Sequence, residues 1–363
     1  MSGTSLLGLG LAVPPHKVSQ ARGTDFLVRV AEAQPMHKPG LARNIERLAR
    51  RSGIATRHSV IPDYAVEPEG FTLYPKNWRL DPFPTTRERL DIYETTAVAL
   101  AETAAREALD EARVTPRDVT HLVLSTCTGF FSPGPDIGLV QRLGLAPTVN
   151  RTVIGFMGCY AGFNGIRTAH DIVRADPSAV VLQVCVELCT LHLQRDDRLQ
   201  TMVSNLLFAD GAAAAVYART PNRGRAEVRG TLSQVASDSL DQMSWRIGNH
   251  GFVMQLAPTV PEHLQQALPS FIEQLCRKMD VSQSEVRSWA VHPGGRRVLE
   301  VVGEGVGSDL AESFHVLEHF GNMSSATVLF VLDRVLREGG GFVGALGFGP
   351  GLTMEAALFH CSS

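Results

Sequence analysis

The sequence has almost no net charge and no long apolar run, and these two shortages exclude whole classes of partner. Its 34 Lys and Arg residues against 37 Asp and Glu residues leave a formal net charge of -3, so nothing favours nucleic acid or an anionic membrane as a partner. No segment approaches the roughly 18 consecutive apolar residues that cross a bilayer, so no integral membrane association is expected. Residues 1–18 lack a basic region, and Gly and Pro interrupt their short apolar run. We therefore expect a strand and turn there rather than a signal peptide.

The chain also lacks the cysteine patterns of disulfide-rich and zinc-binding proteins. Its six cysteines stand in apolar or glycine-rich surroundings, at Cys127, Cys159, Cys185, Cys189, Cys276 and Cys361. In a large chain without a signal peptide we expect these to be reduced thiols of a cytoplasmic enzyme. Cys185 and Cys189 have the spacing C-x3-C, but no second ligand pair follows nearby. No zinc site, and no other metal site, is therefore expected.

The length and the apolar pattern predict an α/β protein of two halves. A chain of 363 residues exceeds one typical hydrophobic core. Short apolar runs predict buried strands, and apolar residues at helical spacing predict helices between them. The predicted strands are 120–125, 179–184, 212–217, 288–291 and 342–346, and the predicted helices are 92–112, 264–279 and 326–337. Strands interleaved with helices indicate an α/β fold, and the polar stretch Thr220–Arg225 is the expected seam between residues 1–222 and 223–363. Residues 60–90 show no clear period and are expected on the surface.

Cys159 stands in the glycine-rich segment Ile154–Gly165 (IGFMGCYAGFNG), just before a predicted helix at 166–173. A cysteine at a turn that opens a helix faces the positive end of the helix dipole, which lowers the thiol pKa. The glycines let a substrate approach the sulfur and can supply backbone N–H donors. The pattern indicates a nucleophile, with a buried cysteine in a packing contact as the alternative.

Three later segments place polar or glycine residues at turns. His292, in Val291–Gly295 (VHPGG), follows a predicted strand, where α/β enzymes hold catalytic side chains; a structural histidine is the alternative. Asn322 precedes an apolar helix, with an ordinary helix-capping residue as the alternative. The segment 345–353 (ALGFGPGLT) contains Gly-x-Gly, but too little chain follows for a dinucleotide-binding βαβ unit. We expect its Gly349 to line a wall of the site.

Together, Cys159, His292 and Asn322 resemble the catalytic residues of type III polyketide synthases, the chalcone-synthase-like family, in their order and in their glycine-bearing turns. The other matching segments are GLAVPP at 10–15, LFADGAA at 207–213, GNMSS at 321–325 and GFGPGLT at 347–353. The resemblance therefore covers nearly the whole chain. It implies a thiolase-like fold, with two fused αβαβα halves in a five-layered arrangement, usually as a homodimer without a prosthetic group.

The resemblance also implies a mechanism. An acyl-CoA starter would load Cys159, and malonyl-CoA would extend the chain by decarboxylative Claisen condensation before cyclisation to a resorcinol, pyrone or related phenolic product. His292 would hold Cys159 as a thiolate in an ion pair. His292 and Asn322 would then donate hydrogen bonds to the enolate oxygen. The segment 243–252 (MSWRIGNHGF) resembles the bacterial members of the family.

Several residues of the expected substrate cavity differ from the plant members. Phe208 matches the family's gatekeeper phenylalanine, which keeps water from the catalytic centre. Met254 stands where the plant pattern has a second gatekeeper phenylalanine, and this flexible side chain favours a longer aliphatic starter. Cys127, Cys189 and His192 stand at positions where plant chalcone synthases carry threonines. We expect these three as pocket walls, and the plant product cannot be carried over.

Coenzyme A carries phosphates, so an enzyme of this kind needs a local basic cluster despite its net charge. The densest early cluster consists of Arg47, Arg50, Arg51 and Arg57. Family members bind the nucleotide with basic residues in this region, which makes Arg51 and Arg57 the candidates for contacts with coenzyme A. A solvated helix face is the alternative for each arginine.

Four other interpretations compete with this one. A ketoacyl-ACP synthase of the initiating type also uses Cys, His and Asn, but takes an acyl carrier protein as partner and has a different asparagine motif. A thiolase would need a second cysteine in a late glycine loop, and Cys361 is poorly placed for that role. A hydroxymethylglutaryl-CoA synthase would need a catalytic Glu in the first half, where none stands out. A non-catalytic protein of the same fold would commonly have lost Cys159 or His292, and this chain retains both.

Overall fold

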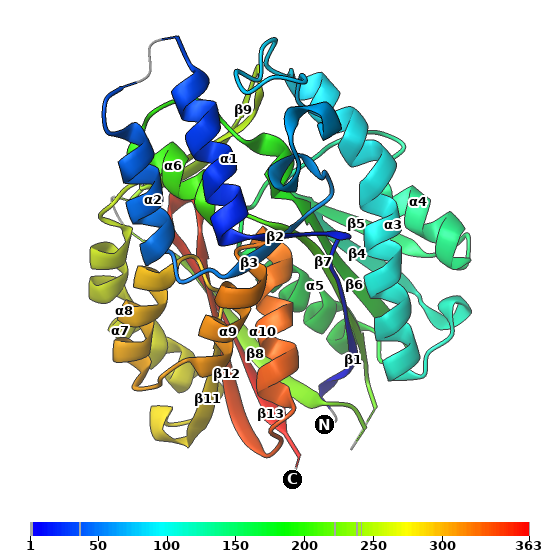
Figure 1. Cartoon of the computed structure of the whole chain (residues 1–363). Helices are drawn as coiled ribbons and strands as arrows, with labels where there is room; N and C mark the ends of the chain where they lie inside the picture. Colours follow the sequence, from blue (N-terminus) through cyan, green and yellow to red (C-terminus); the bar gives the residue numbers. More distant parts are fainter. Residues whose placement is uncertain (1–2, 36–37, 221–222, 237–238, 241, 363) are drawn as a thin grey trace.

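The computed structural model describes residues 3–35, 38–220, 223–236, 239–240 and 242–362, and its elements alternate between strands and helices (Figure 1). The first half contains β1 (Thr4–Ala12), β2 (His16–Ser19), α1 (Gln20–Ala33), α2 (Leu41–Arg51), β3 (Thr56–Ser59), α3 (Thr86–Ala112), β4 (His121–Thr126), α4 (Pro135–Leu143), β5 (Asn150–Gly155), α5 (Ala161–Ala175), β6 (Val180–Leu188), α6 (Leu199–Leu207) and β7 (Asp210–Ala218). The second half contains β8 (Ala226–Val235), β9 (Met243–Gly248), β10 (Gly251–Leu256), α7 (Val260–Met279), β11 (Val286–Val291), α8 (Arg296–Val306), α9 (Ala311–Phe320), α10 (Thr327–Leu336), β12 (Gly341–Gly349) and β13 (Thr353–Cys361). Two short 3-10 turns, η4 (Cys189–His192) and η6 (Ser324–Ala326), border the site described below. Every strand and helix predicted from the sequence is present, although several are longer than predicted.

The strands of both halves join in one nine-stranded sheet. Its order is β11-β12-β13-β8-β1-β7-β6-β4-β5. The halves meet where residues 4–6 of β1 pair antiparallel with residues 226–228 of β8. Strand β4 is parallel to β5 and β6, and β11 is parallel to β12. Parallel neighbours need crossover connections, which explains why helices cover the faces of this sheet.

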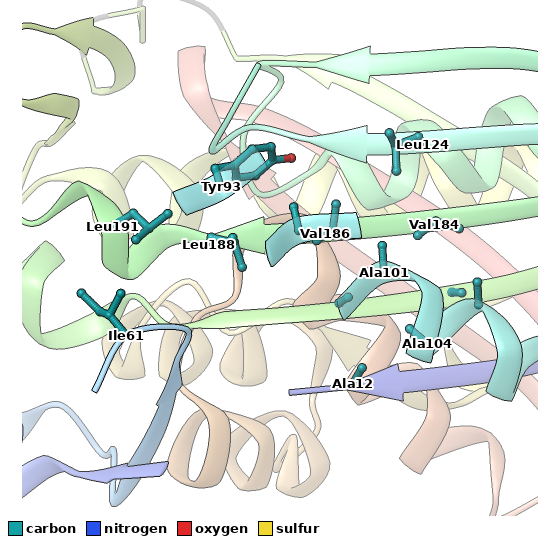
Figure 2. Packing of buried hydrophobic residues seen from close by; sticks show 14 of the residues in the cluster. Ala12, Ile61, Tyr93, Ala101, Ala104, Leu124, Val184, Val186, Leu188 and Leu191 are labelled. Atoms are coloured by element: carbon teal, nitrogen blue, oxygen red, sulfur yellow. The ribbon is translucent and has the colours of Figure 1, made fainter. Parts of the chain in front are cut away.

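Strand β6 shows how the sheet is buried on both faces. Val184 and Val186 lie on the face covered by α3, beside its Ala101 and Ala104 (Figure 2). Cys185, between them in sequence, belongs to the core on the opposite face. Since successive strand residues point to opposite faces, an apolar run without alternation is what a doubly covered strand requires. The small alanines of α3 let this helix pack close to the strands.

Three hydrophobic cores define five layers. The first lies between α3 and the strands of the first half. The second contains α5 and α10 together with inward-facing residues of strands from both halves. The third lies between the strands of the second half and the helices α7 and α8. The layers are thus α3, first strands, α5 with α10, second strands, and α7 with α8, which confirms the predicted five-layered α/β arrangement.

Two segments differ from what the sequence predicted. Helix α3 begins at Thr86 rather than at residue 92, because Thr85 and Glu88 form a capping box that satisfies the first backbone N–H groups. Residues 60–90 are not a surface excursion, since Tyr64 and Phe71 are buried and pack edge-on against Phe26 of α1. Aromatic packing without periodic secondary structure gives no sequence period to detect.

Candidate active site

Cys159 lies in a tight turn between β5 and α5. Phe156 and Gly158 have left-handed backbone conformations, with φ of 60° and 85°; glycine adopts this region freely, whereas phenylalanine does so at a cost in strain. The thiol is buried, with 6% of the residue exposed. It borders a cavity of about 20 Å³ that Phe208 and Trp245 also line. The turn therefore holds the sulfur inside the molecule at the start of α5.

Asn322 reaches the same sulfur from the second half. Its side-chain amide lies 3.8 Å from Cys159 Sγ, and its Oδ1 accepts the Ser324 N–H at 2.8 Å. The segments behind these residues touch: a Cβ added at Gly162 of α5 would lie 2.6 Å from the carbonyl oxygen of Ser325 in η6. This close approach, which requires glycine, brings Cys159 and Asn322 together.

His292 lies directly after β11 and is fully buried. Its backbone N–H donates to the Leu346 carbonyl at 2.8 Å, which ties it to β12. Further along β12, Gly349 lies against Cys159, since a Cβ added there would be 3.5 Å from the Cys159 nitrogen. Neither ring nitrogen of His292 has a hydrogen-bond partner among the described residues. Buried polar groups are usually paired, so these two nitrogens are available to a ligand.

The ion pair predicted between Cys159 and His292 is not formed in this structure. Burial raises the pKa of Cys159 to about 11 and lowers the pKa of His292 to about 3, because each charged form would lose its hydration. The sequence analysis expected a lowered thiol pKa at the start of α5; burial, the largest cause, shifts it the other way. Both shifts favour the neutral thiol and the neutral imidazole, and neither ring nitrogen of His292 is hydrogen-bonded to the thiol.

Glu187, which the sequence analysis did not single out, lies beside this site. It is fully buried near the end of β6. Its Oε2 accepts the Cys127 N–H at 2.9 Å and the Thr128 hydroxyl at 2.8 Å, and its Oε1 accepts the Ser325 hydroxyl. Burial raises the pKa of Glu187 to about 7. Its one signal in the sequence is an acidic residue inside an apolar strand, VVLQVCVEL.

Phe208 and Met254 belong to a wall between two small cavities. The cavity beside the thiol and a second one of about 30 Å³ have four lining residues in common, Cys189, Phe208, Trp245 and Met254. Trp245 on β9 stands opposite Met254 on β10, and its indole N–H donates to the Cys127 carbonyl at 2.8 Å. The sequence analysis named three of these four residues and missed Trp245.

Cys127 and His192 have different positions around these cavities. The sulfur of Cys127 lines the first cavity and accepts the Gly158 N–H at 3.0 Å. His192 lines the second cavity; its Nε2 lies 2.7 Å from the Thr128 carbonyl, and its Nδ1 accepts the Phe252 N–H at 3.1 Å. These bonds define a neutral imidazole, and burial lowers its pKa to about 3. His192 therefore braces the β9–β10 hairpin as well as forming a wall.

The two arginines predicted to contact coenzyme A are separated in the structure. Arg57 is 6% exposed, and its guanidinium donates to the carbonyls of Asn205 and Phe208. It cannot meet a phosphate at the surface, so the prediction for Arg57 is wrong: the side chain is used inside the protein. Arg51 is exposed and borders an apolar cavity of about 250 Å³ with Arg296 and Arg297. The latter two arginines were not singled out in the sequence.

The described residues hold no group of three or more His, Cys, Asp or Glu side chains that could bind a metal ion. Within the same ranges, no helix is long and apolar enough to span a membrane. All six cysteines are free thiols.

Comparisons with known proteins agree with this geometry. The family model for the N-terminal domain of chalcone and stilbene synthases matches residues 2–221, and the model for their C-terminal domain matches residues 227–363. The chain is 31% identical to the alpha-pyrone synthesis polyketide synthase-like Pks18 of Mycobacterium tuberculosis, over 97% of this chain and 90% of the relative.

Two solved structures resemble the whole fold. PKS-I from the brown alga Ectocarpus siliculosus has a TM-score of 0.92 at 30% identity and covers 100% of this chain and 99% of its own. The C-terminal type III polyketide synthase domain of Steely1 from Dictyostelium has a TM-score of 0.89 at 26% identity and covers 99% of this chain and 100% of its own. The thiolase-like fold is thereby confirmed.

The raised pKa of Glu187 predicts a pH-dependent stability difference. The folded state binds the proton of the Glu187 carboxyl more tightly than the unfolded state does. Proton binding therefore stabilises the folded protein fully below the pKa of the unfolded carboxyl, and this stabilisation is lost as the pH rises through about 7. Between pH 5 and pH 8.5, the free energy of unfolding of the wild type should fall relative to Glu187→Gln by about 2 kcal/mol. Urea unfolding at both pH values measures this. Glu273→Gln, on an exposed position of α7, is the control for loss of one charge and should stay within about 0.5 kcal/mol. A constant difference between wild type and Glu187→Gln would contradict the assignment.

Proposed function

The chain belongs to the chalcone and stilbene synthase family and is a type III polyketide synthase, a transferase that carries out decarboxylative condensation, and we propose that Cys159, His292 and Asn322 carry this reaction. One observation supports the assignment above others. A buried thiol lies 3.8 Å from an amide of the other half, and the buried His292 has two ring nitrogens without a protein partner. Unpaired buried nitrogens suit a group whose partner is the substrate.

In the proposed loading step, the Cys159 sulfur attacks the thioester carbonyl of an acyl-CoA starter. The thiol proton passes to a ring nitrogen of His292, the bond between the acyl carbon and Cys159 forms, the bond between that carbon and the coenzyme A sulfur breaks, and His292 returns the proton to the departing coenzyme A. Since burial opposes both charges, the thiolate and imidazolium form together and stabilise each other when the substrate has displaced water from the site.

In the proposed extension step, malonyl-CoA loses carbon dioxide and leaves an enolate at the thioester oxygen. N–H donors from His292 and Asn322 stabilise that oxygen, and loss of one such donor costs about 3–4 kcal/mol. The enolate carbon attacks the acyl carbon on Cys159, the new C–C bond forms, and the bond from that carbon to the Cys159 sulfur breaks. The Cys159 thiolate is released, and the extended chain remains on coenzyme A. These steps use coenzyme A thioesters and need no prosthetic group.

Phe208 fits the role of a gate beside this chemistry. Its ring lines both small cavities, and Trp245 lies near it with ring centroids 6.4 Å apart. Apolar aromatic surface around the thiol excludes water, which would otherwise protonate the enolate. We propose that Phe208 keeps this cavity dry during decarboxylation.

The apolar cavity of about 250 Å³ is the proposed entrance for coenzyme A. Arg51, Arg296 and Arg297 supply positive charge at its lining. The same lining includes Leu207 and Gly294, which are close in sequence to Phe208 and His292. A pantetheine arm can follow the apolar wall while the phosphates meet the arginines.

A pyrone or resorcinol from an aliphatic starter is the proposed product class. The name of the mycobacterial relative refers to alpha-pyrone synthesis, and Met254 is the most flexible member of the wall between the two cavities. The ketoacyl-ACP synthase alternative receives no support, because the matched models, the relative and the solved structures are all of the polyketide synthase kind.

We further propose that the protein forms a homodimer through β5. This strand ends the sheet, so one of its edges has no neighbour among the described strands. Val153 on β5 is 50% exposed, and Phe130 and Met157 nearby are 39% and 37% exposed. An open strand edge with exposed apolar side chains favours pairing with a second chain.

The reaction itself is tested with labelled malonyl-CoA and a panel of acyl-CoA starters. Cys159→Ala should abolish labelled product, and His292→Gln and Asn322→Ala should each lower the rate of extension by about 100- to 1000-fold. If aromatic starters alone are extended, the aliphatic proposal is wrong while the mechanism stands. Extension of acyl carrier protein substrates and of no CoA thioester would contradict the proposed function.

The coenzyme A entrance is tested by replacing Arg296 and Arg297 together with Gln. The KM for malonyl-CoA should rise by about tenfold, equivalent to about 1.4 kcal/mol, while kcat changes less than about twofold because the reacting atoms are untouched. Arg277→Gln on the exposed face of α7 is the control and should leave the KM unchanged. An unchanged KM in the double variant would place the phosphates elsewhere.

The proposed dimer is tested by sedimentation velocity. Val153→Asp should shift the protein from dimer to monomer, because it places a charge in the proposed interface. Val235→Asp, at an exposed position of β8, is the matched control and should stay dimeric. A wild-type monomer, or a dimer that Val153→Asp leaves intact, would refute this interface.

A further inference from the structure

Arg57, on β3, is a buried cation that binds two backbone carbonyls near the site. Its Nη1 donates to the Asn205 carbonyl at 2.9 Å and to the Phe208 carbonyl at 2.6 Å. Burial lowers the pKa of Arg57 to about 10, with Asp210 opposing the shift, so the guanidinium stays charged at neutral pH. Its position is thus determined by charge-assisted hydrogen bonds to the segment that ends in Phe208.

Residues 55–57, the short segment that carries Arg57, also bind the part of the chain that leads to Asn322. The Ala55 N–H donates to the Glu318 carbonyl at 2.7 Å, and the Thr56 hydroxyl donates to the His319 carbonyl at 2.7 Å. The stem of Arg57 packs against Gly321, where an added Cβ would lie 2.9 Å from Arg57 Cγ. Arg57 therefore contacts both loops, one with its guanidinium and one with its stem.

These two loops are paired with each other. The Ala209 N–H donates to the Asn322 carbonyl at 2.9 Å, and the Asn322 N–H donates to the Leu207 carbonyl at 3.0 Å, which forms an isolated bridge between Phe208 and Asn322. Both side chains of this bridge reach the nucleophile: Phe208 lines its cavity, and the Asn322 amide lies 3.8 Å from its sulfur.

We infer that Arg57 is a positioning residue, which holds the Phe208 ring and the Asn322 amide in one fixed arrangement around Cys159. The inference rests on the proposed function of Phe208 and Asn322. Without the guanidinium, two buried carbonyls lose their donor, and the paired loops can shift together. A displacement of about 1 Å in such a site costs about 100-fold in rate. Starter loading depends on the sulfur and suffers less, whereas decarboxylation and C–C bond formation depend on the bridge.

The experiment compares Arg57→Lys and Arg57→Met with Gln20→Met. Gln20 is a matched control because its buried Nε2 donates to the Leu206 carbonyl at 3.1 Å, in the same segment but without contact to Phe208 or Gly321 in the described bonds. Measured for each protein are urea unfolding, the rate of starter loading on Cys159, kcat and KM for malonyl-CoA, and the ratio of malonyl-CoA decarboxylated to C–C bonds formed.

For Arg57→Met, kcat for extension should fall by about 50-fold with KM and the loading rate within about twofold, and the decarboxylation ratio should rise about fivefold. Arg57→Lys, which keeps the charge, should recover about a fifth of the lost rate. Gln20→Met should lower stability only.

The inference is overturned if both Arg57 variants keep the wild-type kcat and the wild-type ratio of decarboxylation to C–C bond formation, or if Gln20→Met shifts that ratio equally. If Arg57→Met does not fold, the test rests on Arg57→Lys, whose ratio of decarboxylation to C–C bond formation is compared with that of the wild type. A wild-type protein that forms no C–C bonds would instead refute the proposed function.

Discussion

The starts of α5 and η6 meet in the central helical layer, between the strands of the first half and those of the second, and the rest of the site depends on how closely they approach. Gly162 leaves no room for a side chain against the Ser325 carbonyl. Behind this contact, α5 and α10 share the central core with strands of both halves. Cys159 and the Asn322 amide that faces it are 163 positions apart in the chain, so their contact exists because the two halves pack on a common layer of helices.

Burial determines the chemistry of the groups gathered there. It raises the thiol pKa of Cys159, lowers the imidazole pKa of His292 and raises the carboxyl pKa of Glu187, so all three favour their neutral forms. A condensing enzyme benefits from such a site, because a dry cavity protects an enolate until it attacks the acyl group. The same burial makes each charged form depend on a partner, which in the proposed mechanism is a substrate oxygen or a neighbouring group.

Much of the fold was predictable, because doubly covered strands have a strong local signal. The run in β6 and the helical period of α7 and α10 were identified without tertiary information. Other features carry no such signal. The pairing of β1 with β8 joins segments more than 200 positions apart, and aromatic packing around Phe26 and Tyr64 has no period. The start of α3 at Thr86 could have been predicted, because Thr85 and Glu88 have the spacing of a capping box. The apolar helical pattern alone did not include these residues.

The sequence by itself determined the α/β class and, through its glycine-bearing turns, the three residues Cys159, His292 and Asn322 as the candidates for chemistry. Local composition suffices for this because a turn, a strand end and a glycine-rich segment are short-range features. The tertiary structure decided which groups are buried, and with that the direction of their pKa shifts, and where each arginine lies. The sequence does not distinguish Arg57 from Arg51, because both belong to one basic cluster. In the structure Arg57 is buried against backbone carbonyls, whereas Arg51 borders an open cavity. Burial and long-range contacts arise only when distant segments pack together, and they set both the protonation of a group and the partner that it meets.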